Sequence, residues 1–241
     1  RARVEAVKTT SHASPETVKR LLQINPDLFI MVRLYTAGST EGRPNVVTPD
    51  GFVFDAVYTL SPVLEADARI EYLEVHNEPN LTIEGLGGYW HDGEEFGNWF
   101  LEVVEKLRAR FPDAKFGFPG LSPGPTSTAQ GRMDSEVFLA QAEFAAQQAD
   151  WIGMHAYWVN EKEMAERDLG FNFISYRERF PEKLLFLTEF GNPRQPRAVV
   201  AEQYARYYGM LRHVNGLGAA FAYILSTSDP VESARWAWRD E

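Results

Sequence analysis

Cysteine is absent from this chain of 241 residues. That absence removes disulfides, thiolate metal sites and cysteine nucleophiles together, and it leaves the compartment open. Positive charge is also in short supply, because 24 Lys and Arg stand against 34 Asp and Glu, for a formal net charge of −10. A surface with that balance repels phosphate backbones, so we expect no nucleic-acid partner.

Long apolar runs and glycine-rich phosphate loops are missing as well. No stretch approaches the roughly 18 consecutive apolar residues that cross a bilayer, so we expect no membrane partner. No dinucleotide-type or P-loop turn follows a predicted strand. The five histidines are scattered, and His12 and His91 show no metal-ligand spacing. We therefore expect no metal and no cofactor.

Short apolar segments alternate with helical patterns along the chain. Most of these segments are near-continuous in apolar residues, which is typical of strands covered on both faces. Seven are predicted as strands: 4–10, 28–35, 70–77, 115–119, 151–157, 184–189 and 219–225. Strands that alternate with helices predict a parallel sheet with right-handed crossovers.

Helix boundaries are clear at several places. Ser14 is a candidate N-cap with Pro15 at the first helical position, and a second helix starts at Asp134. Asn215-Gly216 is a C-cap signal for a helix that begins near residue 196. A further helix is predicted from six apolar residues that share one helical face: Phe96, Trp99, Phe100, Val103, Val104 and Leu107.

The fold predicted from this pattern is an α/β (β/α)8 barrel that lacks, or does not show, its first strand. A closed parallel barrel has eight strands, and the chain opens as "RARVEAVKTT", without an initiator Met and already inside a predicted strand. We expect a single catalytic domain over residues 1–241 that is incomplete at its N-terminus. An open doubly wound sheet is the alternative, and the absence of a glycine-rich turn disfavours it.

Two predicted strands end in a glutamate: Glu78 in "VHNEP" and Glu189 in "LTEFG". A barrel brings strand ends to one face, where catalytic groups lie. Two opposed carboxyl groups are the minimum equipment for cleaving a glycosidic bond, since one protonates the leaving oxygen and the other attacks the anomeric carbon or activates water. Asn77 suits a hydrogen bond to the neighbouring sugar hydroxyl, a bond that strengthens in the transition state.

Three strand ends, "YLEVHNEPN", "IGMHAYW" and "LLFLTEFG", together resemble the clan A retaining glycoside hydrolases. The resemblance implies a (β/α)8 barrel, with Glu78 as acid/base, Asn77 as the 2-hydroxyl contact and Glu189 as nucleophile. It also implies that Tyr157 bonds the nucleophile and that His155 lines the sugar subsite. Both glutamate strands stand one place earlier than in the family, which is consistent with a missing first strand.

Two features depart from that resemblance. Many members carry a tryptophan at the end of the last strand, where "AFAYILSTSD" has none, and Trp236 and Trp238 come too late to take the role. The absent first strand would leave sheet edges exposed. Both departures keep an alternative open: a catalytically inactive barrel that binds carbohydrate or a protein partner. A metal-dependent hydrolase or isomerase is disfavoured by the scattered histidines.

Several residues near strand ends have competing interpretations. Glu74 has the parity to point into the barrel, where an unpaired charge is costly, so we expect a structural ion pair with Lys8 or Arg33. Arg33 is alternatively a site residue that keeps the nucleophile ionised. Trp90 and Trp158 lie where aromatic rings stack on sugar faces.

The sequence thus predicts a retaining glycoside hydrolase acting on an oligo- or polysaccharide by a two-glutamate double displacement. It does not choose the sugar, the linkage, endo or exo action, or the oligomeric state. An extracellular location is mildly favoured, because polymeric substrates lie outside cells.

Overall fold

The computed structural model describes residues 4–36, 48–67, 69–224 and 237. Its strands form one sheet in the order in which they follow along the chain. They are β1 (Ala6–Thr10), β2 (Phe29–Leu34), β3 (Tyr72–Val75), β4 (Lys115–Phe118), β5 (Trp151–Tyr157), β6 (Leu184–Gly191) and β7 (Leu217–Ala222). The helices are α1 (Pro15–Ile24), α2 (Pro49–Ala66), α3 (Gly93–Arg108), α4 (Ser135–Ala146), α5 (Glu161–Met164), α6 (Phe173–Arg179) and α7 (Arg197–Leu211).

The predicted fold class is confirmed. Neighbouring strands from β1 to β5 pair in parallel, as do β6 and β7. Each strand up to β6 is followed by at least one helix, which is the alternation of the (β/α)8 barrel, with seven of its eight strands among the described residues. Within this part of the chain, no helix is long and apolar enough to cross a membrane.

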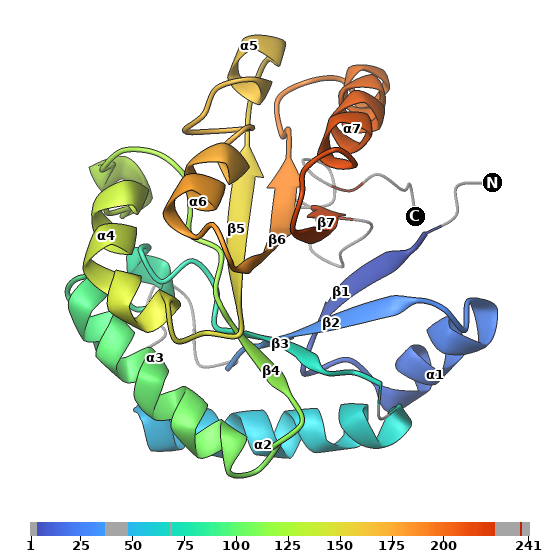
Figure 1. Cartoon of the computed structure of the whole chain (residues 1–241), viewed down its shortest axis with the longest axis vertical. Helices are drawn as coiled ribbons and strands as arrows, with labels where there is room; N and C mark the ends of the chain where they lie inside the picture. Colours follow the sequence, from blue (N-terminus) through green and yellow to red (C-terminus); the bar gives the residue numbers. More distant parts are fainter. Residues whose placement is uncertain (1–3, 37–47, 68, 225–236, 238–241) are drawn as a thin grey trace. The chain divides into compact units, whose positions relative to one another are not determined.

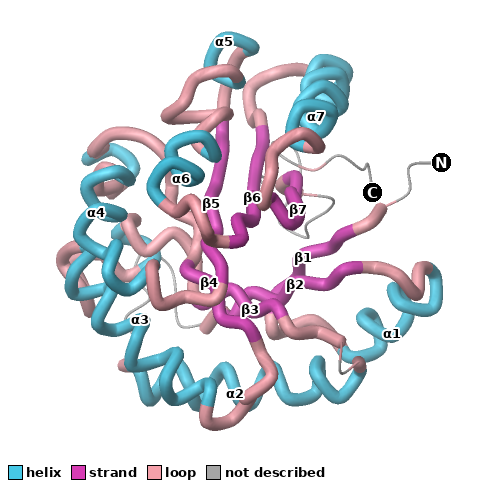
Figure 2. Tube along the Cα trace, viewed as in Figure 1, coloured by secondary structure: helices cyan, strands magenta, loops and turns pink. Residues whose placement is uncertain are grey.

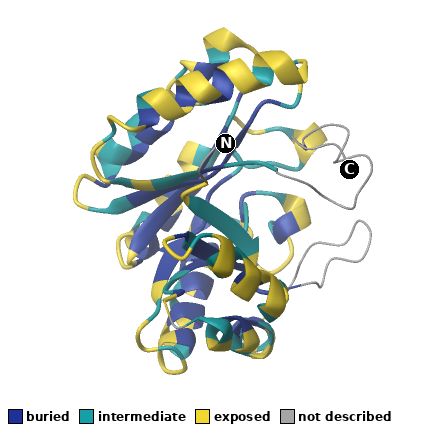
Figure 3. Cartoon of the chain, turned by 90° about the vertical axis from the view of Figure 1, so that its right-hand side faces the viewer, coloured by how far each residue is buried: buried dark blue, intermediate teal, exposed yellow. Residues whose placement is uncertain are grey.

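The chain divides into two compact units, Arg1–Ile152 and Gly153–Glu241, with the boundary inside β5. In the first unit consecutive helices pack side by side, α1 on α2, α2 on α3 and α3 on α4 (Figure 1). The strands β1–β4 lie on the inner side of these helices (Figure 2). The helices are coloured as buried along one side and as exposed along the other (Figure 3), as amphipathic helices on a covered sheet are.

An aromatic cluster forms the core of the first unit. The six apolar positions predicted on one face of α3 are all buried there. Phe96 contacts Trp99 on its own helix, Phe118 at the end of β4 and Phe138 on α4. The stripe read from the sequence therefore joins the helix layer to the strands.

The second unit contains the rest of β5 and the elements from α5 to β7. Its core is a second aromatic cluster, in which Phe190 of β6 packs against Tyr204 and Tyr207 of α7. Burial raises the pKa of Tyr204 to about 12, so its hydroxyl stays protonated and accepts the backbone N–H of Asn192. This cluster fixes α7 against the strand that carries Glu189.

Helix starts follow the sequence closely, and one helix end does not. Ser14 caps α1 by accepting the N–H of Thr17, and Asp134 caps α4. By contrast, α7 ends at Leu211, so the prediction that it runs to Asn215-Gly216 was wrong. Gly216 instead has a φ of 72° in the turn that leads into β7. Positive φ is what favours glycine there, and a turn before a strand needs it as much as a helix end does.

Strand ends differ from prediction by a few residues. β7 begins two residues before the predicted 219–225 segment, and β3 is shorter than 70–77 at both ends. Trp236 and Trp238 lie outside the described residues.

Candidate active site

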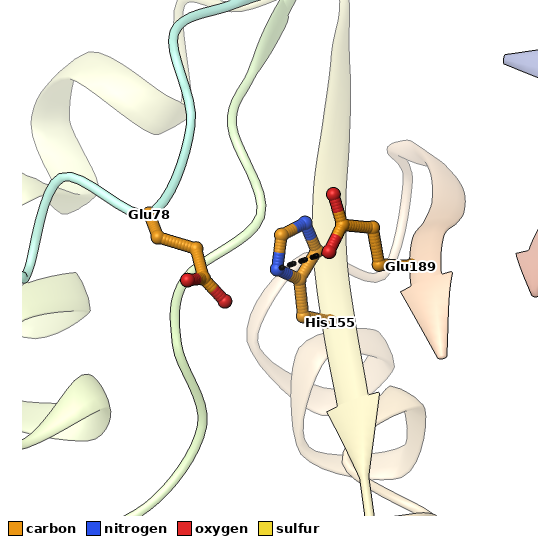
Figure 4. A group of neighbouring side chains, drawn as sticks. All are labelled: Glu78, His155 and Glu189. Carbon is orange, nitrogen blue, oxygen red and sulfur yellow. Dashed lines mark ion pairs between the residues drawn. The ribbon is translucent and has the colours of Figure 1, made fainter. Parts of the chain in front are cut away.

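The segment His76–Glu78 leaves β3 with an unusual backbone. His76 has a φ of 76° and Glu78 a φ of 35°, and neither residue is glycine. Such conformations cost on the order of 1–3 kcal/mol each and persist only where surrounding contacts hold them. Here the N–H of His76 donates to Leu34 O at 3.1 Å, and the N–H of Glu78 donates to Gly120 O at 3.1 Å. The last residue of β2 and the loop after β4 therefore hold the backbone of this segment, and the side chain of Glu78 extends from the ribbon in Figure 4.

The two residues after Glu78 are held equally firmly. The indole N–H of Trp90 donates to Pro79 O at 2.8 Å. Asn80 is fully buried, donates to Ser122 O and Met133 O at 2.9 and 3.0 Å, and accepts the N–H of Ser122 at 2.9 Å. Sequence reasoning missed Asn80, although an Asn beside a strand-ending Pro is a signal for such backbone bonds. Hydrogen bonds thus hold the backbone on both sides of the Glu78 side chain.

Asn77 is held through its amide. Its Nδ2 donates to Glu84 Oε1 at 2.8 Å, while its Oδ1 is buried and accepts no hydrogen bond from the described residues. Its backbone N–H donates to His76 Nδ1 at 2.7 Å. Glu84 ends a short 3₁₀ turn (Thr82–Glu84) and is itself buried. The sequence did not single out Glu84, because nothing in the spacing marks it.

Glu74 is fully buried in β3 and accepts from two cations. Arg33 Nε lies 2.7 Å and Lys8 Nζ 3.2 Å from Glu74 Oε2, so the predicted structural ion pair is present with both candidate partners. Gly120 N–H also donates to Glu74 Oε1, at 3.4 Å. Gly120 therefore links the Glu74 carboxylate, through its N–H, to the backbone N–H of Glu78, through its O. Arg33 was also predicted to bind substrate or the nucleophile, and that role stays a prediction.

His76 lies inside the aromatic cluster of the first unit. Its ring stacks on Phe52 and meets Trp90 and Trp99 edge-on. Burial lowers its pKa to about 4, so it is neutral at pH 7. Its Nδ1 lies 2.7 Å from the backbone N and 2.8 Å from the backbone O of Asn77, so the ring contacts both polar groups of that residue's backbone. His76 is thus a packed histidine that supports Asn77.

Trp90 corrects a sequence prediction. It was expected to stack on sugar, but it is fully buried between His76, Phe96 and Trp99, and its indole N–H is used by Pro79. A sugar platform must offer a ring face, and this ring offers none. Tyr89, its neighbour, is 39% exposed.

Glu189 lies near the end of β6 and is nearly buried. The hydroxyl of Tyr157 donates to Glu189 Oε2 at 2.5 Å, a length typical of an O–H···carboxylate bond. His155 Nδ1 faces the same oxygen at 3.7 Å, beyond hydrogen-bond range (Figure 4). Asn172 donates to the backbone oxygen of His155 and so fixes the end of β5. These predicted site residues of the second unit are therefore neighbours.

Trp158 corrects a second prediction. It was expected to stack on sugar, but it is buried and parallel to Phe190, with ring centroids 5.9 Å apart. Its indole N–H donates to Gln203 Oε1 at 2.9 Å, and Asn192 Nδ2 donates to the same oxygen at 2.8 Å. Trp158 therefore belongs to the core that supports β6. Gln203 was not foreseen, because it lies on a distant helix.

Solved structures similar to this chain are glycoside hydrolases. A GH128 subgroup II endo-β-1,3-glucanase from Sorangium cellulosum matches at 15% identity over 86% of this chain and 74% of its own, with a TM-score of 0.59. A GH128 subgroup VI exo-β-1,3-glucanase from Aureobasidium namibiae matches at 12% identity over 95% and 88%, with a TM-score of 0.58. A GH128 subgroup I endo-β-1,3-glucanase from Amycolatopsis mediterranei, in complex with laminaritriose, matches at 16% identity over 95% and 91%, with a TM-score of 0.54.

The sequence matches no protein-family model and no curated protein sequence. The structural matches show the fold, since their identities lie between 12% and 16%. The barrel that the resemblance to clan A glycoside hydrolases implied is thereby confirmed. Fold alone does not assign chemistry, which has to be argued from the site.

Proposed function

We propose that this chain is a retaining glycoside hydrolase, with Glu189 as nucleophile and Glu78 as acid/base. The observation that carries the proposal is a glutamate at the carboxyl end of both β3 and β6, each held by its own hydrogen bonds. In a (β/α)8 fold the carboxyl ends of the strands form the active face. The fold likeness to glycoside hydrolases supports the same assignment.

In the first step a Glu189 carboxylate oxygen attacks the anomeric carbon and forms an ester bond to it. The bond from that carbon to the leaving oxygen breaks, its electron pair goes to the oxygen, and Glu78 gives that oxygen its proton. In the second step Glu78 takes a proton from water, whose oxygen attacks the anomeric carbon and releases Glu189. Each turnover consumes one water and restores both glutamates.

The surroundings of the two glutamates suit these different roles. Glu189 is nearly buried, and the hydroxyl bond from Tyr157 stabilises its ionised form, which is the attacking form. Glu78 is half-buried on a loop whose backbone is fixed, so it can exchange protons with a leaving group and then with water. We expect the two carboxyl groups to stand about 5–5.5 Å apart in the active enzyme, as retention requires.

The substrate proposed first is a β-linked glucan. Three of the similar structures are β-1,3-glucanases, two of endo and one of exo action, and one of them is bound to laminaritriose. We therefore expect hydrolysis of laminarioligosaccharides before that of other glycans. Asn77 would bind the 2-hydroxyl, and Arg33 and His155 would contact the substrate or the nucleophile.

The deciding experiment is incubation with activated 2-deoxy-2-fluoro glycosides, starting with the β-glucosyl and β-laminaribiosyl compounds, followed by intact-protein and peptide mass spectrometry. We expect one covalent adduct on the peptide that contains Glu189. Glu189→Gln should give no adduct, whereas Glu182→Gln, which changes an exposed glutamate on the same unit, should label like the wild type.

Two results would overturn the proposal. An adduct on another residue would remove Glu189 from the role of nucleophile. Binding of laminarioligosaccharides by the folded wild type without adduct or turnover would make the chain an inactive binding barrel instead.

A further inference from the structure

The amide of Asn77 has only one orientation available. A carboxylate accepts hydrogen bonds and cannot donate them, so Nδ2 of Asn77 must face Glu84 Oε1, which lies 2.8 Å away. Oδ1 is then directed elsewhere, and it is buried without a donor from the described residues. Buried amide oxygens normally accept a hydrogen bond, so this oxygen is available as an acceptor for a donor on a bound ligand.

Glu84 is held in place independently of Asn77. Its backbone N–H donates to Leu81 O at 3.1 Å, closing the 3₁₀ turn that carries it. Thr82 N–H donates to Gly131 O at 2.7 Å, which ties the turn to the loop after β4. Glu84 is 9% exposed, so it is not a mobile surface carboxylate. The donor and acceptor of the Asn77–Glu84 bond are thus both anchored.

We propose that Glu84 is a positioning residue that fixes and polarises Asn77, so that Oδ1 accepts a hydrogen bond from the 2-hydroxyl of the substrate. This inference rests on the proposed function and names a residue that the resemblance to known hydrolases does not supply. Positive charge that develops at the anomeric carbon makes the adjacent hydroxyl a stronger donor, so an acceptor there stabilises the transition state more than the bound substrate.

In its ionised form, Glu84 strengthens this acceptor. Hydrogen bonds in a chain polarise one another, and a carboxylate that draws on the N–H of an amide increases the electron density at its oxygen. The loop, the amide and the substrate hydroxyl would then form a chain from Glu84 to Asn77 to the sugar. Glutamine at position 84 keeps the shape but removes both the charge and the constraint on the orientation of the amide.

The test compares Glu84→Gln with the wild type on two aryl β-glucosides that differ only in the 2-hydroxyl. On the ordinary glucoside we expect kcat to fall about ten-fold, as for loss of a hydrogen bond to a charged group, with a smaller change in KM. On the 2-deoxy glucoside we expect the variant to equal the wild type. Glu94→Gln, which alters an exposed glutamate at the start of α3, is the matched control and should change neither rate.

Coupling provides the second measurement. In an Asn77→Ala background, replacement of Glu84 by Gln should have no further effect on kcat for the ordinary glucoside, because Glu84 acts through Asn77. Equal losses on both glucosides, or additive losses in the double variant, would overturn the inference and leave Glu84 a structural residue.

Failure of the inference can be told from failure of the proposed function. Fluorine at C2 cannot donate a hydrogen bond, so 2-fluoro glycosides should inactivate Glu84→Gln at the wild-type rate. If the wild type is labelled but Glu84→Gln is inactivated more slowly, only the inference about Glu84 is contradicted. A folded wild type that is never labelled and does not turn over contradicts the proposed function, and the role of Glu84 falls with it.

Discussion

Replacement of Glu74 by alanine tests how the first unit is held together. The carboxylate is fully buried and accepts from Arg33 and Lys8, whose side chains are only 10% and 12% exposed. Removing it leaves two nearly buried cations without their anion. Breaking a buried ion pair in this way costs about 3–5 kcal/mol. For a protein of this size, each kcal/mol lowers Tm by about 2–4 °C, so a fall of about 6–20 °C is expected.

Glu71, directly before β3, provides a matched control. It also pairs with a lysine, since Glu71 Oε2 lies 2.8 Å from Lys115 Nζ, but both side chains are more than 40% exposed. Exposed pairs contribute about 0–1 kcal/mol, so Glu71→Ala should be nearly silent. The two variants remove the same chemical group three residues apart, and burial is the main difference between them.

The assay is urea unfolding followed by circular dichroism, with calorimetry for Tm. Glu74→Gln should lie between the wild type and Glu74→Ala, because an amide oxygen can still accept from Arg33 Nε. If Glu74→Ala loses no more stability than Glu71→Ala, the argument that burial gives this pair its weight is refuted.

Three further predictions concern other buried groups. Burial lowers the pKa of His76 from 6.5 to about 4, so between these pH values the unfolded chain binds a proton that the folded chain excludes. The free energy of unfolding should therefore fall on acidification by up to about 3 kcal/mol. In urea titrations at pH 4 and pH 7, His76→Phe should lose most of this pH dependence of stability. Gln203→Leu leaves two buried donors unpaired and should lower the free energy of unfolding by about 2–4 kcal/mol, against almost nothing for the exposed Gln148→Leu. Tyr157→Phe removes the hydroxyl bond to Glu189 and should slow labelling by 2-fluoro glycosides about ten-fold or more, with unchanged circular dichroism. Labelling of this variant at the wild-type rate would contradict the proposal that Tyr157 assists Glu189.

The sequence predicted features that depend on local pattern. The alternation of strand and helix, the stripe on α3 and the caps at Ser14 and Asp134 follow from spacing and from backbone groups close in the chain. The partners of Glu74 were also foreseen, because strand parity places a charge inside and a buried charge needs an opposite one.

Features that depend on distant partners were not predicted. Trp90 and Trp158 follow strand ends, where a ring can face either substrate or core. The choice is decided by acceptors at Pro79 and Gln203, 11 and 45 residues away along the chain. The bond from Asn77 to Glu84 spans seven residues through a 3₁₀ turn that has no periodic signal.

One helix was obscured by its own composition. The sequence pattern predicted no helix between the second and third strands, yet α2 begins at Pro49 and continues past Pro62. An internal proline and a weakly amphipathic face hide such a helix from pattern analysis. Its N-cap, Thr48, which accepts the N–H of Gly51 at 3.1 Å, was the one local signal available.

The positive φ angles at His76 and Glu78 cost folding stability, and Glu78 is a residue that we propose for catalysis. Glycine and asparagine adopt this backbone more cheaply than glutamate does, so a sequence selected for stability alone would replace position 78 first. Random mutagenesis screened by thermal tolerance should therefore accumulate stable proteins that have lost Glu78, the residue that we propose as acid/base. Laboratory evolution of this scaffold has to select for turnover in every round.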